Sequence, residues 1–379
     1  MSNLFPTYSR WEVEPEWAEG SFLYGKDGKK YLDFTSGIGV NNLGHRPKAV
    51  QEAVQDQLNR FWHVSNLFPV EIQEIAAGKL AQAAGMDLVF FANSGAEANE
   101  AAIKLSRKAT GRKKIITFHQ SFHGRTFATM SATGQDKIKT GYGPMLETFT
   151  YVPYNDLEAL KAEMSDDVAA IMLEVIQGEG GVYPATQEFL NGVENLCKQY
   201  GSLLVIDEIQ TGIGRTGKPF AFQHFGIKPD IVSVAKGLGN GFPIGAIIGR
   251  KELKDVFGSG SHGTTFGGNP LSVSSAIATM NIIFDENFLA EVNQKADYLQ
   301  KSLQESLLAL PNVKEIRGLG FMIGIEVNMQ VPEILKDLRS NGLIVLSAGE
   351  NVVRLLPPLT VTNEEMSKGI EILTSVLSK

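Results

Sequence analysis

Cysteine is nearly absent from this sequence, in which Cys197 is the single example among 379 residues. One thiol can form neither an internal disulfide nor a cysteine-based metal cluster. Because Cys197 falls in a stretch with amphipathic helical spacing, we expect a buried structural thiol. His119 and His123 have the i, i+4 spacing of metal ligands, but Gly124 would interrupt a helix there and no third ligand is near in sequence. A metal site is therefore not expected.

Positive charge is also in short supply, since 35 Lys and Arg residues against 42 Asp and Glu residues leave a net charge of -7. A nucleic-acid partner would need a clustered basic face, and the densest basic stretch, residues 107–114, is typical of a solvated helix end. No apolar run approaches the ~20 residues of a membrane span, and the N-terminus lacks a basic-then-apolar signal pattern. We expect no nucleic-acid or membrane partner and a cytoplasmic location.

Glycine, in contrast, is abundant, with 39 residues that gather at the ends of short apolar runs. From residue 88 onward these runs alternate with stretches of helical spacing. Strands alternating with helices predict an α/β fold with a mainly parallel sheet covered by helices on both faces. The predicted strands are residues 88–91, 114–118, 169–174, 202–207, 231–235 and 246–248.

The two ends of the chain have other patterns. Residues 22–33 read as a β-hairpin around a Gly-Lys-Asp-Gly turn. Further helical spacing covers residues 48–61, 70–84, 271–308 and 364–377. We therefore predict two domains: a large cofactor-binding domain over residues 51–270, and a smaller one formed by residues 1–50 together with residues 271–379.

Lys236 stands where the apolar run of residues 230–235 ends and a glycine-rich loop begins. In an open α/β sheet, ligands bind outside the carboxyl ends of the strands. Apolar surroundings lower the pKa of an amine, and a neutral lysine can form a Schiff base with a carbonyl group. The alternative is a solvated lysine at a strand end.

Two further strand ends carry polar groups. Asp207 ends a run that reads as buried on both faces, so its carboxylate needs a cationic partner, such as a protonated pyridine nitrogen. A structural arginine or a helix-capping role would also satisfy it. Ser94, Gly95 and Ala96 open a helix directly after the first predicted strand, where free backbone N–H groups suit a phosphate. A plain Ser-capped helix is the alternative.

The stretch Gly212–Gly217 matches the spacing of dinucleotide-binding glycines and, with Lys218, comes close to a P-loop. Residues 207–211 separate these glycines from the preceding strand, and Pro219 occupies the place of the P-loop hydroxyl. We expect neither kind of site, which disfavours a nicotinamide-dependent dehydrogenase.

Six motifs, in order and spanning nearly the whole chain, resemble the class III pyridoxal-phosphate-dependent aminotransferases. They are Ser94-Gly95-Ala96, Phe122-His123-Gly124-Arg125-Thr126, Gln177-Gly178-Glu179-Gly180-Gly181, Asp207-Glu208-Ile209-Gln210-Thr211-Gly212, Ala235-Lys236-Gly237 and Thr264-Thr265-Phe266-Gly267-Gly268-Asn269-Pro270. The resemblance implies a fold-type I homodimer with a mainly parallel, seven-stranded-type sheet between helices and a smaller α+β domain. Pyridoxal 5'-phosphate would be the cofactor.

The resemblance also implies roles around that cofactor. Lys236 would hold it covalently and carry the proton between substrate and cofactor. Asp207 would pair with the ring nitrogen, and Gln210 would lie near the ring hydroxyl. Phe122 would stack on the ring face, while the amides of Gly95-Ala96 would bind the phosphate.

Other residues would serve the neighbouring subunit or the substrate. Thr265 would reach the phosphate of the partner subunit's cofactor, and Thr264 would line the substrate site. Arg125 and Arg354 resemble the carboxylate-binding arginines of the family, although each could form an ordinary surface ion pair. Glu179 would pair with Arg354 and cover its charge, with flanking glycines giving the backbone room to move.

Within this family, the compact length and the stretch Phe61–Leu67 are most similar to members that transfer the terminal amino group of N-acetylornithine to 2-oxoglutarate. The resemblance therefore implies a step in arginine biosynthesis. Ornithine, succinylornithine, succinyl-diaminopimelate and 4-aminobutyrate are alternative donors. The stretch Leu43–Pro47 is one residue shorter than is common in the family, which bears on the substrate rather than on the chemistry. A cofactor-free binding protein is disfavoured because both Lys236 and Asp207 are present.

Overall fold

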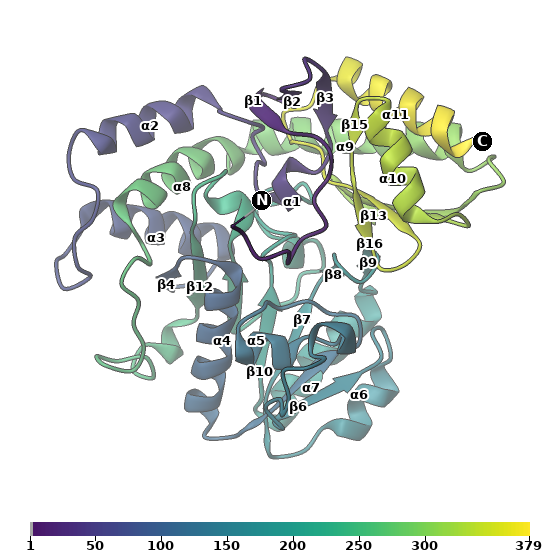
Figure 1. Ribbon diagram of the computed structural model, residues 1–379. Helices are drawn as coiled ribbons and strands as arrows, with labels where there is room; N and C mark the ends of the chain where they lie inside the picture. Colours follow the sequence, from purple (N-terminus) through teal and green to yellow (C-terminus); the bar gives the residue numbers. More distant parts are fainter. Residues whose placement is uncertain (1–2) are drawn as a thin grey trace.

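The computed structural model describes residues 3–379, and its core is a seven-stranded sheet with helices on both faces (Figure 1). The strand order is β4-β12-β11-β10-β7-β5-β6. The strands are β4 (Leu88–Ala92), β5 (Lys114–Phe118), β6 (Phe149–Val152), β7 (Val168–Glu174), β10 (Leu203–Asp207), β11 (Ile231–Val234) and β12 (Gly245–Gly249). Only β12 runs antiparallel to its neighbours within this sheet, which confirms the predicted α/β class and the mainly parallel sheet.

Alternate residues of the buried strands serve the two faces of the sheet. On β10, Val205 packs with the apolar face of α4, whereas Leu204 and Ile206 pack on the side covered by α7. Every residue of β7 is buried, as a strand covered on both faces requires. Strand β6 was not predicted, because its four residues are at the sheet edge and are mostly half-buried.

The helices around this sheet match most of the predicted helical spacing. They are α2 (Lys48–Leu58), α3 (Glu71–Ala84), α4 (Gly95–Thr110), α5 (Phe127–Ala132), α6 (Leu157–Glu163), α7 (Gln187–Tyr200) and α8 (Pro270–Ile283). The predicted helical stretch of residues 271–308 is two helices, α8 and α9 (Glu286–Leu307). Asp285 divides them, because its side chain accepts a hydrogen bond from the Phe288 amide at 3.0 Å and caps α9.

The rest of the chain forms two smaller sheets with their own helices. The first joins β1 (Pro15–Glu19), β2 (Phe22–Gly25), β3 (Lys30–Asp33) and β15 (Leu343–Ile344); the second joins β13 (Val313–Leu319), β14 (Met322–Val327), β17 (Val352–Leu355) and β16 (Leu346–Ala348). The remaining elements are α1 (Ser36–Gly39), β8 (Ile176–Gln177), β9 (Tyr183–Pro184), α10 (Val331–Ser340), α11 (Asn363–Leu377) and the 3₁₀ turns η1 (Asp136–Ile138), η2 (Ala221–His224), η3 (Lys236–Leu238) and η4 (Lys251–Leu253).

The predicted hairpin is confirmed as β2 and β3, which pair antiparallel. Strand β3 also pairs with β15, so the N-terminal segment and the C-terminal part share one sheet. This shared sheet supports our division of the chain at residues 50 and 270, which stays a proposal. Among residues 3–379, no helix has the length and apolarity needed to cross a membrane.

Candidate active site

A cavity of about 460 Å³ opens at the carboxyl ends of β7, β10 and β11. Parallel strands place their last residues at one sheet edge, so side chains distant in sequence meet there. The lining includes Ser94, Gly95, Ala96, Phe122, His123, Arg125, Glu174, Glu179, Asp207, Gln210 and Lys236. Residues from six separate segments of the chain thus line one site. The two strand-end residues Lys236 and Asp207 are among them.

Lys236 follows β11 in a tight 3₁₀ turn and has a positive φ of 43°, which is uncommon for a residue with a side chain. The turn is packed closely: a Cβ atom on Gly237 would lie 2.3 Å from Asn42 Nδ2, so glycine is required there. Burial lowers the pKa of Lys236, and the nearby Glu179 carboxylate only partly opposes this effect. A larger fraction of the Lys236 amine is therefore neutral than in a free lysine at the same pH.

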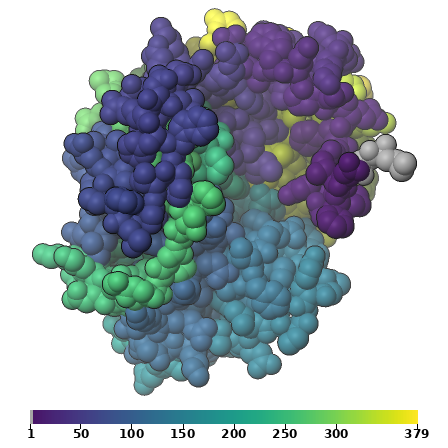
Figure 2. Space-filling model, turned by 60° about the vertical axis from the view of Figure 1, so that its left-hand side comes forward, coloured from purple at the N-terminus to yellow at the C-terminus, as the bar shows by residue number. Residues whose placement is uncertain are grey.

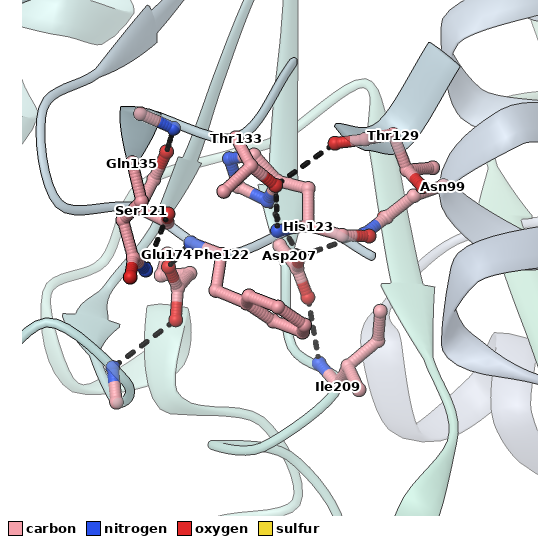
Figure 3. A network of polar contacts seen from close by, with 12 residues as sticks. Asn99, Ser121, Phe122, His123, Thr129, Thr133, Gln135, Glu174, Asp207 and Ile209 are labelled. Carbon is pink, nitrogen blue, oxygen red and sulfur yellow. Dashed lines mark hydrogen bonds and ion pairs between the residues drawn. The ribbon is translucent and has the colours of Figure 1, made fainter. Parts of the chain in front are cut away.

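Asp207 is held by a buried hydrogen-bond network, shown in Figure 3. Its Oδ2 atom lies 2.8 Å from both Asn99 Nδ2 and His123 Nδ1, and its Oδ1 accepts the Ile209 amide at 3.0 Å. A carboxylate only accepts hydrogen bonds, so His123 Nδ1 must carry the proton. Within residues 3–379 no lysine or arginine pairs with Asp207, which excludes the structural-arginine alternative.

His123 and Asn99 were not predicted as site residues. His123 was considered only as a metal ligand, and residues 3–379 contain no group of three or more His, Cys, Asp or Glu that could bind a metal ion. The network depends on a helix, a loop and a strand end that meet only in the fold. No short motif signals it.

The start of α4 forms one end of the cavity. Ser94 is the N-cap, and its side chain accepts the Glu97 amide at 3.2 Å. The amides of Gly95 and Ala96 belong to the first turn, whose N–H groups have no partner inside the helix. A Cβ atom on Gly95 would lie 2.8 Å from the Ile209 side chain, which would have to shift to admit it. This end of the cavity combines free amides with the positive end of a helix dipole, which suits an anion.

Glu174, the last residue of β7, is a second buried carboxylate in the cavity wall. Its two oxygens accept the Phe122 amide at 3.0 Å and the Gly178 amide at 3.1 Å. Burial raises the pKa of Glu174 to about 7, although His123 opposes the shift. The residue fixes the loop that presents Phe122. It was not predicted, although its place at the end of a predicted strand is the same signal that identified Asp207.

Arg354, in β17, brings the C-terminal part of the chain to the site. It is 2 % exposed, and its Nη1 donates to Glu179 Oε1 at 2.7 Å and to Gln210 Oε1 at 2.9 Å. Burial alone would raise the pKa of Glu179, but the charges of Arg354 and Lys236 lower it to about 2. The ion pair is thus internal rather than a surface pair, and Gln210 lies against it.

The glycines around Glu179 have a packing role besides the one we expected. A Cβ atom on Gly178 would lie 2.4 Å from Gln210 Oε1, and one on Gly180 would lie 2.6 Å from the Gln120 carbonyl oxygen. Both glycines therefore permit close packing, Gly178 against a side chain and Gly180 against backbone. Whether they also let the backbone move stays a prediction.

The remaining predicted residues lie at or beyond the edge of the cavity. Arg125 is exposed at its wall, with no carboxylate partner among the described residues. Thr264 does not line the cavity in this chain but accepts a hydrogen bond from Asn93, which does, at 3.2 Å. Thr265 is exposed and also outside the lining. Cys197 is buried, as predicted.

The glycine-rich stretch Gly212–Gly217, where we expected no nucleotide site, contacts distant parts of the chain through Arg215. Its Arg215 is fully buried, and its guanidinium donates to the Pro357 carbonyl oxygen at 2.5 Å and to Asn42 Oδ1 at 2.6 Å. Burial lowers the pKa of Arg215 to about 9. No α-helix follows Gly217, and the next element is the short turn η2.

A lysine amine, an anion-binding helix start and a buried carboxylate around one cavity define an amine-converting enzyme of the pyridoxal-phosphate type. The family model "Aminotransferase class-III" matches residues 7–377. The chain therefore belongs to the class III aminotransferases, and it is a pyridoxal-phosphate-dependent transaminase, as its motifs indicated.

Three similar proteins indicate which members of the family this chain resembles. The chain is 58% identical, over 379 residues, to the acetylornithine aminotransferase of Bacillus subtilis (strain 168), covering 100% of this chain and 98% of that protein. The solved N-acetylornithine aminotransferase of Stenotrophomonas maltophilia K279a has a TM-score of 0.86 and 34% identity, covering 98% of this chain and 95% of that one. The Toxoplasma gondii ornithine aminotransferase, with partial occupancy of PLP at its active site, has a TM-score of 0.94 and 30% identity, covering 99% of this chain and 92% of that one.

Proposed function

We propose that this enzyme transfers the terminal amino group of N2-acetyl-L-ornithine to 2-oxoglutarate, giving N-acetylglutamate 5-semialdehyde and L-glutamate, a step of arginine biosynthesis. The observation that carries the proposal is the 58% identity over the whole chain to an acetylornithine aminotransferase. The similar fold of an ornithine aminotransferase keeps ornithine as the alternative donor. A panel of ω-amino donors with 2-oxoglutarate, ranked by kcat/KM, tests the choice; a higher value for ornithine than for acetylornithine would overturn it.

The cavity fits pyridoxal phosphate on three features. The amides of Gly95 and Ala96 are free to bind the phosphate, and the Asp207 carboxylate, without a lysine or arginine partner among residues 3–379, is free to pair with a cationic ring nitrogen. Phe122 also lines the cavity and offers an apolar ring. When bound, the cofactor supplies an aldehyde that condenses with amines and a ring that accepts electrons from the substrate carbon.

Lys236 performs the proton transfers in this proposal. Its lowered pKa leaves a share of the side chain neutral, and a neutral Nζ can attack a carbonyl carbon and later accept a proton from the substrate carbon. The Asp207 carboxylate, held by His123, Asn99 and the Ile209 amide, supplies negative charge in the cavity wall. Arg125, exposed and without an acidic partner among residues 3–379, binds a substrate carboxylate at the cavity wall.

The Glu179–Arg354 pair lets one cavity accept two different amino donors. With the pair closed, the Arg354 charge is covered and an apolar chain carrying a terminal amine can enter. With Glu179 turned away, the guanidinium can bind the carboxylate of glutamate. The distance of 2.7 Å between Arg354 Nη1 and Glu179 Oε1, and the burial of Arg354, support a closed resting state.

Glu179→Ala should slow the acetylornithine half-reaction much more than the glutamate half-reaction. Without the carboxylate, the Arg354 charge opposes the amine substrate but still accepts glutamate. We expect a differential loss of about 5- to 150-fold in kcat/KM, or ~1–3 kcal/mol, measured by single-turnover absorbance changes for each donor.

The matched control is Glu315→Ala. Glu315 also pairs with an arginine at 2.7 Å, but on the exposed face of β13, so both half-reactions should stay unchanged. Equal losses on both sides in Glu179→Ala would contradict the charge-covering role.

We also propose a homodimer in which each subunit completes the partner's site. Asn66 Nδ2 donates to the Thr264 carbonyl oxygen at 3.2 Å, and Asn269 Nδ2 to the Trp62 carbonyl oxygen at 3.1 Å, so two loops form one surface. Their segments lie on the same face of the molecule (Figure 2). Exposed large apolar side chains gather on them: Phe61, Trp62, Leu67, Phe68 and Phe266. Such a patch is typical of a protein interface, and the exposed Thr265 is the sequence neighbour of Phe266 in it.

Thr265→Ala should lower the affinity for pyridoxal phosphate, and mixing this variant with Lys236→Ala should restore activity. Each mixed dimer contains one site with both residues intact, provided that they come from different subunits. About a quarter of all sites would be intact after random exchange. Turnover after subunit exchange, followed with differently tagged chains, measures the effect.

Thr360→Ala, which removes another exposed threonine hydroxyl, is the control and should leave cofactor affinity unchanged. An absence of rescue in verified mixed dimers would mean that Thr265 serves its own subunit's site.

The cytoplasm remains the proposed location, because a chain whose single thiol, Cys197, is buried and unpaired needs no oxidising compartment to fold.

A further inference from the structure

A second cavity, of about 380 Å³, lies on the other side of Glu179. Its lining includes the charged residues Asp136, Lys137, Glu179, Glu326 and Glu350. Glu179 is the one residue that lines both this cavity and the active-site cavity. The residue that covers Arg354 therefore stands in the wall between two hollows.

The backbone around Glu179 has contacts on both sides, so we consider a turn of the side chain alone. The Glu179 carbonyl oxygen accepts the Gly349 amide at 2.8 Å. Figure 1 shows β8 and β16, the strands that precede these two residues, close together. Gly180 packs on the Gln120 backbone, where a Cβ atom would lie 2.6 Å from the carbonyl oxygen. If the Glu179 carboxylate leaves Arg354 while its backbone stays in place, the second cavity is the space into which it can turn.

A carboxylate that turns into this cavity gives up a buried arginine and needs another cation. Lys137 is the one lysine or arginine in the cavity lining. It is exposed, and it forms no ion pair with any residue from 3 to 379. Lys137 lies in η1, on a segment separate from both Glu179 and Arg354.

Three acidic residues also line the cavity. Glu326 is already paired with Arg317 at 2.6 Å and with Lys314 at 3.7 Å. Asp136 and Glu350 are exposed and form no ion pair with a lysine or arginine among the described residues, although the charge of Asp136 acts on the nearby Lys139. Since these two carboxylates oppose an incoming Glu179, the lysine charge is needed to offset them.

We propose that Lys137 receives the Glu179 carboxylate in the second cavity and so holds open the state in which Arg354 binds the carboxylate of glutamate or 2-oxoglutarate. Lys137 is then a specificity-determining residue that acts through Glu179 and sets the balance between the two half-reactions. The inference rests on the charge-covering role of Glu179 proposed above.

Lys137→Met should slow the glutamate half-reaction about 3- to 10-fold and leave the acetylornithine half-reaction unchanged, because only the open state loses its cation. The Kd of glutarate, a dicarboxylate without a reacting amine, should rise by the same factor in calorimetry. Glu350→Gln should act in the opposite direction, speeding the glutamate half-reaction about 2-fold, because one opposing charge is removed.

Lys161→Met is the control, since Lys161 is also exposed, pairs with Glu158 at 2.7 Å and lines neither cavity. In a Glu179→Ala background, Lys137→Met should have no further effect. An effect that persists in that background, or equal slowing of both half-reactions, would overturn the role of Lys137 alone. Equal losses in Glu179→Ala itself would instead overturn the charge-covering proposal.

Discussion

Lys236→Ala should fold, bind pyridoxal phosphate and lose turnover by several orders of magnitude. The loss combines two functions, since general acid–base catalysis alone contributes about 10²–10⁴-fold and the covalent link is lost as well. The groups that fit the phosphate and the ring nitrogen, at Gly95-Ala96 and Asp207, are untouched. Steady-state turnover with acetylornithine and 2-oxoglutarate, alongside cofactor content after gel filtration, measures both parts of the expectation.

Lys236→Arg keeps a positive charge at this position but removes the amine. A guanidinium stays protonated and cannot act as nucleophile or base, so this variant should be as inactive as Lys236→Ala. Lys228→Ala, which removes an exposed lysine near the start of β11, should behave as the wild type. Turnover near the wild-type rate in Lys236→Ala, with the cofactor bound, would refute the catalytic assignment.

The strand-end part of the site was predictable from the sequence because its signal is local. Apolar runs that end in Asp207 and Lys236 indicate buried strands, and parallel strands bring their carboxyl ends to one edge. The Ser94-Gly95-Ala96 helix start follows the same logic. Local periodicity therefore identifies both the sheet and the residues at its edge.

The groups that hold those residues were not predictable, because they depend on contacts between distant segments. Asn99 and Asp207 are 108 positions apart, and His123 and Asp207 are 84 apart. The burial of Arg354 requires the C-terminal sheet to pack on the large one, which no residue pattern near Arg354 signals. The place of Arg354 and Glu179 came instead from family resemblance, and the structure adds the packing that explains the adjacent glycines.

The Asp207 network also links the stability of the fold to the proposed role of Asp207. Asn99 and His123 are buried, so the carboxylate in the cavity wall is also the acceptor for Asn99 Nδ2 and His123 Nδ1. A buried donor without an acceptor costs about 1–3 kcal/mol. Changes at position 207 should therefore lower both the Tm of the cofactor-free protein and the rate of the reaction, and a control must separate the two.

Asp207→Ala should weaken pyridoxal-phosphate binding and slow the proton-abstraction half-reaction by on the order of 10²-fold or more, because a fixed charge facing the ring is lost. Asp207→Glu, which keeps the charge, should lose less. Asp230→Ala is the matched control. Asp230 accepts the Leu204 amide at 2.8 Å and pairs with Arg250. It lies at the amino ends of the paired strands β10 and β11, whereas Asp207 lies at the carboxyl end of β10. Asp230→Ala should lower Tm without slowing the half-reaction. If stopped-flow rates fell equally in Asp207→Ala and Asp230→Ala, the effect would be one of stability, and the electrostatic role of Asp207 would be wrong.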